Sequence, residues 1–262
     1  MKNNLRGMKL RSNLLWRLLW RLLGIVFFLG VWQWVAARGG GLALASPLQT
    51  WSALADLAAQ PWFWTQGMLP TLGRVLAGFA LGFLAGGLLG WAAGIFPEAG
   101  LMLLPFRWVL SSVPGVVLVI LAMLWCGVGS GMIILIVALT CAPTIYMALQ
   151  EGLRAVDPAL CEMARAYRVT LRKRFAELYL PAVAAPLVSA CVVALGGGMR
   201  VAILGETLGA SQGLGYTLAL ARADLNTPML YAVALVSMLL VSAIEATFLR
   251  CLRNKLCCGG RP

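Results

Sequence analysis

The fold of this chain is decided by residues 108–150, which read WVLSSVPGVVLVILAMLWCGVGSGMIILIVALTCAPTIYMALQ and contain no charged side chain. This stretch is too long for one membrane-spanning helix, which needs about 20 residues. The glycine cluster at 127–131 divides it, because glycines permit a tight turn. We therefore predict two spanning helices joined by that turn, with Pro114 and Pro143 bending or interrupting them.

The rest of the chain shares this apolar character. Of its 262 residues, 61% are hydrophobic and only 11% are charged, whereas a soluble domain carries roughly 25% charged residues. Lipid must therefore be the solvent for most of the chain. The net charge of +12 does not indicate a nucleic-acid partner, because the basic residues flank apolar runs and do not line one face.

Four further apolar segments complete a prediction of an all-α polytopic membrane protein with six transmembrane helices. They run over residues 22–37, about 71–96, 181 to about 204, and about 228–249. We divide the chain into a basic cytoplasmic N-terminus (1–21), a first transmembrane helix with an external loop (22–64), a core of five transmembrane helices (65–250), and a basic cytoplasmic tail (251–262). A short amphipathic helix is expected at about 48–59 in the external loop.

The orientation follows from the distribution of charge. Seventeen of the 21 basic residues fall on one side of the six-helix topology, and the exceptions are Arg38, Arg74, Arg200 and Arg222. Because positive residues stay in the cytoplasm, both termini are predicted to lie inside. The N-terminal segment has two interpretations: a signal peptide cleaved near Ala36-Ala37, or a retained helix anchored by its tryptophans.

One predicted span carries a glycine stripe. Glycine recurs every four residues, at Gly78, Gly82, Gly86, Gly90 and Gly94. This spacing places small residues along one helix face, where another helix can approach closely.

The 151–180 segment is the longest charged loop. Asp157-Pro158 predicts a helix start, with aspartate at the N-cap and proline at the first helical position, and this helix runs to about Tyr167. Thr170 is expected to begin a second short helix that ends before Pro181. The loop is either a solvated basic connection or, as two ordered helices favour, a docking surface for a cytoplasmic partner.

Several motifs in and around this loop carry a family resemblance. In and next to the loop they are Val156-Asp157-Pro158, Glu162-Met163-Ala164-Arg165-Ala166-Tyr167, Thr170, Phe175 and Leu180-Pro181. Elsewhere in the chain they are TLGRVLAGF (71–79), WCGVG (125–129) and GETLGASQGLGY (205–216). The loop resembles the EAA loop of ABC importer permeases, and the last motif is similar to the nitrate/sulfonate/taurine branch. The resemblance covers about residues 65–255.

The resemblance implies a type I ABC importer permease core in a bacterial inner membrane, in which the first short helix is a coupling helix seated in a groove of an ATPase subunit. The residues implied in this coupling are Asp157, Pro158, Glu162, Met163, Ala164, Arg165, Arg168, Thr170, Phe175, Leu180 and Pro181. Arg168 stands where the family usually has the glycine of the turn. The implied partners are a second copy of the chain, a cytoplasmic ATPase dimer that holds ATP and Mg, and a periplasmic or lipid-anchored solute-binding protein. The implied solute is small and anionic, such as a sulfonate or nitrate.

The chain itself lacks the residues of an enzyme. It has no GxxxxGK[ST] phosphate loop and no histidine, so we expect no catalytic site, no metal and no cofactor on it. An ion-coupled secondary transporter and a non-transport assembly protein are the alternatives. Seven cysteines form no CxxC pair, and a metal or lipidation role for Cys257 and Cys258 stays open.

Charges inside the spans are the candidates for a translocation pathway. Arg200 follows three glycines and has three interpretations: it pairs with Glu206, it reaches to the outer interface, or it lines the path of an anion. We place Arg200 and Glu206 in the pathway and expect Glu245 to pair with Arg250.

Overall fold

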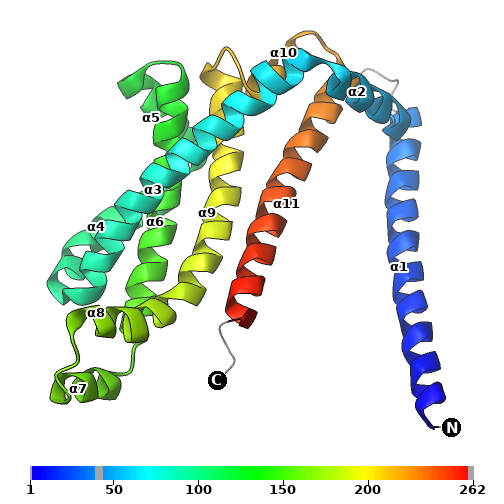
Figure 1. Cartoon of the computed structure of the whole chain (residues 1–262). Helices are drawn as coiled ribbons and strands as arrows, with labels where there is room; N and C mark the ends of the chain where they lie inside the picture. Colours follow the sequence, from blue (N-terminus) through cyan, green and yellow to red (C-terminus); the bar gives the residue numbers. More distant parts are fainter. Residues whose placement is uncertain (1, 39–43, 259–262) are drawn as a thin grey trace. The chain divides into compact units, whose positions relative to one another are not determined.

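The computed structural model describes residues 2–38 and 44–258, which form helices and short connections (Figure 1). The described residues make two compact units. One comprises the residues up to Ala59 together with Ala221–Ala234, and the other comprises Gln60–Leu220 with the residues from Leu235 onward.

The first unit contains a long helix and a short one. Helix α1 runs over Lys2–Arg38 and α2 over Pro47–Ala59, close to the short helix predicted at 48–59. The Trp32 indole donates a hydrogen bond of 3.0 Å to the carbonyl oxygen of Ala45, and its ring centre lies 6.0 Å from that of Tyr231. Tyr231 lies at the start of α11, which spans Thr227–Cys258.

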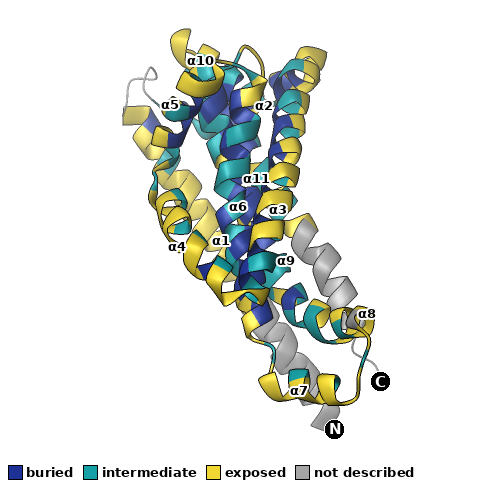
Figure 2. Ribbon diagram, turned by 90° about the vertical axis from the view of Figure 1, so that its left-hand side faces the viewer, coloured by how far each residue is buried: buried dark blue, intermediate teal, exposed yellow. Residues whose placement is uncertain are grey.

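The core of the second unit is built from α3 (Leu69–Ile95), α6 (Ser130–Arg154) and α9 (Leu180–Gly209). Helix α6 lies between the other two and carries much of the buried surface (Figure 2). Its side chains Ile133 and Ile136 are fully buried, as is Met199 of α9.

The glycine stripe of α3 faces the backbone of α6. A Cβ atom on Gly78 would lie 2.6 Å from Cβ of Val137, and one on Gly82 would lie 2.7 Å from the carbonyl oxygen of Ala138. Gly86 and Gly90 meet the backbone of the next turns of α6, and Gly94 meets the side chain of Leu153. Any side chain along this stripe would force the two helices apart.

The predicted third span is a broken helix. Helix α4 (Pro97–Ser112) and α5 (Gly115–Cys126) meet at an angle of 103°, and Pro114 caps the second of them. The proline interrupts the helix as predicted, although α4 begins earlier than expected and includes the predicted loop 97–107. Pro143 does not interrupt its helix, because α6 continues through this buried residue. Packing against α3 and α9 holds α6 together although its backbone lacks one hydrogen-bond donor.

Two wide helical turns precede prolines. The backbone N–H of Leu180 donates to the carbonyl of Phe175 in the π-turn η2 (Phe175–Tyr179), directly before Pro181, and η1 (Phe63–Met68) precedes Pro70 in the same way. A proline ring clashes with the carbonyl four residues earlier, and a π-turn moves that carbonyl aside. The prediction that the second short helix ends before Pro181 is therefore wrong, because α8 (Leu171–Arg174) continues through η2 into α9.

The described helices confirm a polytopic all-α membrane fold. Five are long and apolar enough to cross a membrane, and the bent pair α4–α5 makes a sixth span if it is counted as one. Among the described helices too short to cross a membrane are α2, α7 (Pro158–Ala166) and α10 (Leu214–Ala223).

Candidate functional site

Helix α7 is built as the sequence predicts. The Asp157 carboxylate accepts a hydrogen bond of 2.9 Å from the backbone N–H of Ala159, and Pro158 occupies the first helical position. An N-cap of this kind satisfies one of the free N–H groups at the start of a helix. The helix ends at Ala166, one residue before the predicted end at Tyr167.

The turn after α7 keeps a left-handed conformation without glycine. Arg168 has φ of 49°. Its backbone N–H donates a hydrogen bond of 3.0 Å to the carbonyl oxygen of Arg165. The N–H of Val169 donates one of 3.0 Å to the carbonyl oxygen of Ala164. These two bonds form a Schellman motif, in which the left-handed position usually belongs to glycine. The structure therefore preserves the turn geometry and places the strain on Arg168.

Helix α7 projects beyond the ends of α6 and α9 and buries none of its residues (Figures 1 and 2). Met163 and Tyr167 are 53% and 78% exposed. The segment is nevertheless attached to the core, since the ring of Phe175 lies 5.0 Å from that of Trp91 on α3. Cys161 Sγ on α7 also lies 3.9 Å from the Tyr179 hydroxyl. A helix that is anchored at its base but leaves apolar side chains such as Met163 uncovered has the form of a docking surface.

The sequence-predicted coupling residues divide into two groups in this segment. Asp157, Pro158, Glu162, Met163, Ala164, Arg165 and Arg168 lie on α7 or its ends. Thr170, Phe175, Leu180 and Pro181 lie in the segment that returns to the membrane, where Phe175 contacts Trp91. The structure thus brings the first group together on one exposed helix and places the second at its base.

A second polar site lies inside the core, at the end of α9 near Gly209. Glu206 is fully buried and forms an ion pair with Arg74 of α3, with 2.7 Å between Oε1 and Nη1. The same carboxylate accepts hydrogen bonds from the Thr71 hydroxyl (2.7 Å) and from the backbone N–H of Gly215 (3.0 Å).

Arg74 and Thr71 also hold the loop that follows α9. The Arg74 guanidinium donates a hydrogen bond of 2.7 Å to the carbonyl oxygen of Gln212, and one of 3.0 Å to the Ser130 hydroxyl at the start of α6. The Thr71 hydroxyl accepts from the backbone N–H of Leu214. These contacts join α3, α6, α9 and the start of α10, so they fix the loop between α9 and α10.

The glycines of this loop make room for the carboxylate. Gly213 has φ of 116°, and a Cβ atom on it would collide with the carboxylate of Glu206. A Cβ on Gly215 would lie 2.6 Å from Cβ of Glu206. The motifs at 71–79 and 205–216 therefore meet around one buried ion pair.

The predicted pairing of Arg200 with Glu206 is wrong. Glu206 is saturated by Arg74, Thr71 and Gly215, whereas Arg200 Nη2 lies 3.5 Å from Oε1 of Glu245 on α11. Residues six apart on a continuous helix point about 120° away from one another, because each residue turns by 100°. Glu245, which was expected to pair with Arg250, is thus in contact with Arg200. The side chains of Arg250, Cys257 and Cys258 lie outside the described residues, so the expectations for them stay predictions.

The sequence alone did not indicate that Arg74, Thr71 and Gly215 bind Glu206, or that Gly213 leaves room for its carboxylate. The available signal was charge: an arginine in an apolar span requires a compensating acid, and Glu206 is one of few acids in these segments.

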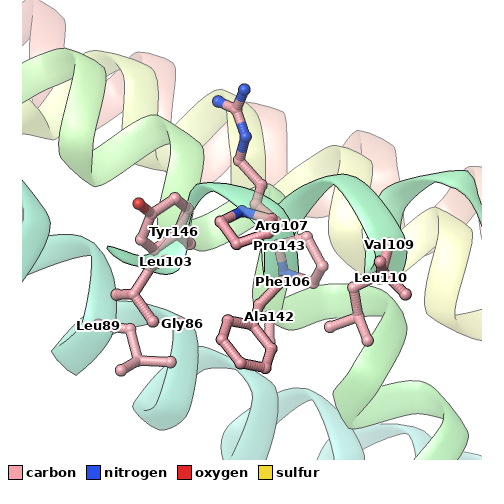
Figure 3. A pocket seen from close by; sticks show the side chains of 11 residues that line it. Gly86, Leu89, Leu103, Phe106, Arg107, Val109, Leu110, Ala142, Pro143 and Tyr146 are labelled. Atoms are coloured by element: carbon pink, nitrogen blue, oxygen red, sulfur yellow. The ribbon is translucent and has the colours of Figure 1, made fainter. Parts of the chain in front are cut away.

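A cavity of about 440 Å³ lies between α3, α4 and α6. Leu89, Phe106 and Leu110 line it, and the Arg107 guanidinium is turned away from these side chains (Figure 3). An apolar cavity of this kind offers no charge to an anionic solute.

Comparisons with known proteins agree with this architecture. The family described as "binding-protein-dependent transport system inner membrane component" matches residues 78–252. A probable ABC transporter permease protein of Haemophilus influenzae is 28% identical over 84% of this chain and 89% of its own length. The putative aliphatic sulfonates transport permease protein SsuC of Escherichia coli (strain K12) is 31% identical over 77% of each chain.

A solved structure shares the fold. A chain of the MetNI methionine ABC transporter, in an inward-facing conformation, superposes with a TM-score of 0.64 and 21% identity, covering 75% of this chain and 98% of that one. This likeness confirms the predicted type I ABC importer permease core. The family match, which covers more than half of the sequence, shows that the chain belongs to the inner membrane components of binding-protein-dependent transport systems.

Proposed function

We propose that this ABC importer permease works as a homodimer in the bacterial inner membrane, with both termini in the cytoplasm and one ATPase subunit docked on each copy. The permease carries no catalytic site, as its family membership shows. We place ATP and Mg on the partner ATPase, and a periplasmic or lipid-anchored binding protein on the outer side. The ion-coupled carrier and assembly-protein alternatives are set aside by the family match.

The observation that carries the docking proposal is the state of α7. It is capped and closed by a Schellman turn, yet none of its residues is buried. Such a helix is ordered before it meets a partner, so docking requires little loss of conformational entropy. Closure of the two ATPases on ATP would then move both α7 helices, and the permease halves would rock between inward and outward access.

The solute we propose is a small anion such as an aliphatic sulfonate or nitrate. Support comes from the relatives that are named as aliphatic sulfonate permeases, one of them 31% identical, and from the 205–216 motif.

Glu162→Lys tests the docking proposal. Glu162 is exposed on α7, and no ion pair of it occurs within the described residues. Loss of one charge-assisted hydrogen bond costs roughly 1.5–3 kcal/mol, and charge reversal adds repulsion. We therefore expect the variant to remain in the membrane but to lose co-purification with the ATPase subunit by tenfold or more.

Glu98→Lys is the matched control, because Glu98 is an exposed glutamate in the first turn of a different helix, α4. It should co-purify normally. ATPase recovery that stays normal in the Glu162→Lys variant, as in the control, would refute docking through Glu162 of α7.

A further inference from the structure

Arg200 and Glu245 form an incomplete ion pair inside apolar segments. The segments are Arg172–Gly209 and Thr227–Thr247. Their single contact is 3.5 Å long, and the side chains are 67% and 33% exposed. No other hydrogen bond of Arg200 occurs within the described residues, so most of its five N–H donors are left available.

The Glu245 carboxylate of this pair lies directly against α9 at Gly196. A Cβ atom on Gly196 would collide with the Glu245 carboxylate, so the glycine leaves the space in which this acid lies against the helix. Gly196 is one turn before Arg200, which means that the guanidinium reaches back along α9, as helical side chains do. It therefore points away from Gly209, about 14 Å further along the helix. This direction argues against the interpretation that Arg200 reaches to the outer interface.

The face of α9 beside Arg200 is open. Val193, Gly197 and Arg200 share this face by their spacing of four and three residues. Val193 is 64% exposed, and no atom lies within 4 Å of the position that a Cβ on Gly197 would take. Glycine at 197 thus leaves room for a small molecule next to the guanidinium.

A charged side chain with free donors is poorly tolerated against lipid, and within spans such residues face a bundle interior or a water-filled path. Arginine also presents a planar fork that matches the oxygens of a carboxylate or sulfonate. The open face therefore suits an aqueous path that an oxyanion enters.

We propose that Arg200 binds the anionic group of the transported solute, and that Glu245 limits the affinity of this site. This inference rests on the proposed function, since it places the pair in the translocation path. Glu245 neutralises the arginine before the solute arrives and keeps one donor occupied. The anion then takes the free donors but is held weakly, as a pathway requires if solute is also to leave.

The test uses a reporter thiol beside the pair, in the full chain reconstituted in nanodiscs. The seven native cysteines are replaced by serine, and Gly197→Cys is introduced where the structure leaves open space. We measure the reaction rates with a sulfonate-bearing and a trimethylammonium-bearing methanethiosulfonate reagent. Phe27→Cys on α1, which is 71% exposed in an apolar span, serves as the control for a thiol in lipid.

We expect Cys at 197 to react with both reagents, to prefer the sulfonate-bearing one, and to be protected by ethanesulfonate. Arg200→Gln should lower the preference about tenfold and abolish protection, because one nearby positive charge is lost. Glu245→Gln should raise the preference for the sulfonate-bearing reagent and strengthen the protection by ethanesulfonate. A thiol at 197 that is as unreactive as that at 27 would overturn the proposal, as would a preference that Arg200→Gln leaves unchanged.

These measurements involve neither the ATPase nor the binding protein. Failure of ATPase co-purification with the unaltered chain would therefore refute the proposed function separately. In the assembled transporter, Arg200→Gln should retain ATPase co-purification while ethanesulfonate uptake falls at least tenfold. Normal uptake by this variant would overturn the role of Arg200.

Discussion

The buried ion pair between Arg74 and Glu206 should dominate the stability of the core, and Arg74→Met tests this. The substitution roughly conserves side-chain length but removes the donors to Glu206, Gln212 and Ser130. Glu206 has no exposed surface, so its charge cannot be compensated by solvent. Breaking one side of a buried pair costs about 3–5 kcal/mol, and we expect a loss of that size in the free energy of unfolding.

The double variant Arg74→Met, Glu206→Gln separates the loss of the pair from the loss of packing. Glutamine can still accept from Thr71 and Gly215, so removing the unpaired charge should recover about 2 kcal/mol or more. Unfolding in mixed detergent micelles, followed by tryptophan fluorescence, measures all members of the double-mutant cycle.

The more exposed pair, Arg200 and Glu245, is the control for this cycle. Its contact is longer and both side chains are accessible, so its coupling energy should stay below about 1 kcal/mol. Additive losses at Arg74 and Glu206 would refute the view that the two residues stabilise the core as a pair.

Two further predictions concern glycine positions. Arg168→Gly should stabilise the turn after α7 by about 1 kcal/mol, because it relieves the left-handed strain at φ of 49°; slower chymotryptic cleavage at Tyr167 would show this, and unchanged or faster cleavage would contradict it. Gly82→Ala should lower the free energy of unfolding by roughly 1–3 kcal/mol, because its Cβ would lie 2.7 Å from the carbonyl oxygen of Ala138. Gly73→Ala, in open space on the same helix, should be neutral or stabilising, and equal losses in these two variants would argue against close packing of α3 on α6.

Local rules explain how much of the fold was predictable. The spans and the start of α7 follow from apolar length, an aspartate N-cap and a proline at the first helical position, all of which act within a few residues. The continuation of α8 into α9 was not predicted, because a π-turn compensates for Pro181. Packing on α3 likewise keeps α6 continuous through Pro143. Such compensation depends on the neighbouring structure, which a proline rule does not include.

The ion pair of Glu206 could not be predicted for a different reason. Arg74 is 132 residues away, and only the fold brings them together. Sequence proximity favoured Arg200 instead, although helical geometry already argued against a pair six residues apart. Charge balance among the apolar spans could have identified Arg74 as a candidate, but not the contribution of Thr71 and Gly215.

The two charged residues in the second half of α9, Arg200 and Glu206, differ in their burial and in how fully they are paired. Glu206 is fully buried and satisfied by an arginine, a hydroxyl and a backbone N–H, so it cannot respond to a solute without disrupting the core. Arg200 has one long contact and an open face beside it. A membrane protein gains little from an arginine that is neither buried nor fully paired, since its desolvation is only partly offset. The exposed arginine is therefore better explained by a ligand than by the fold, whereas Glu206 is explained by the fold alone.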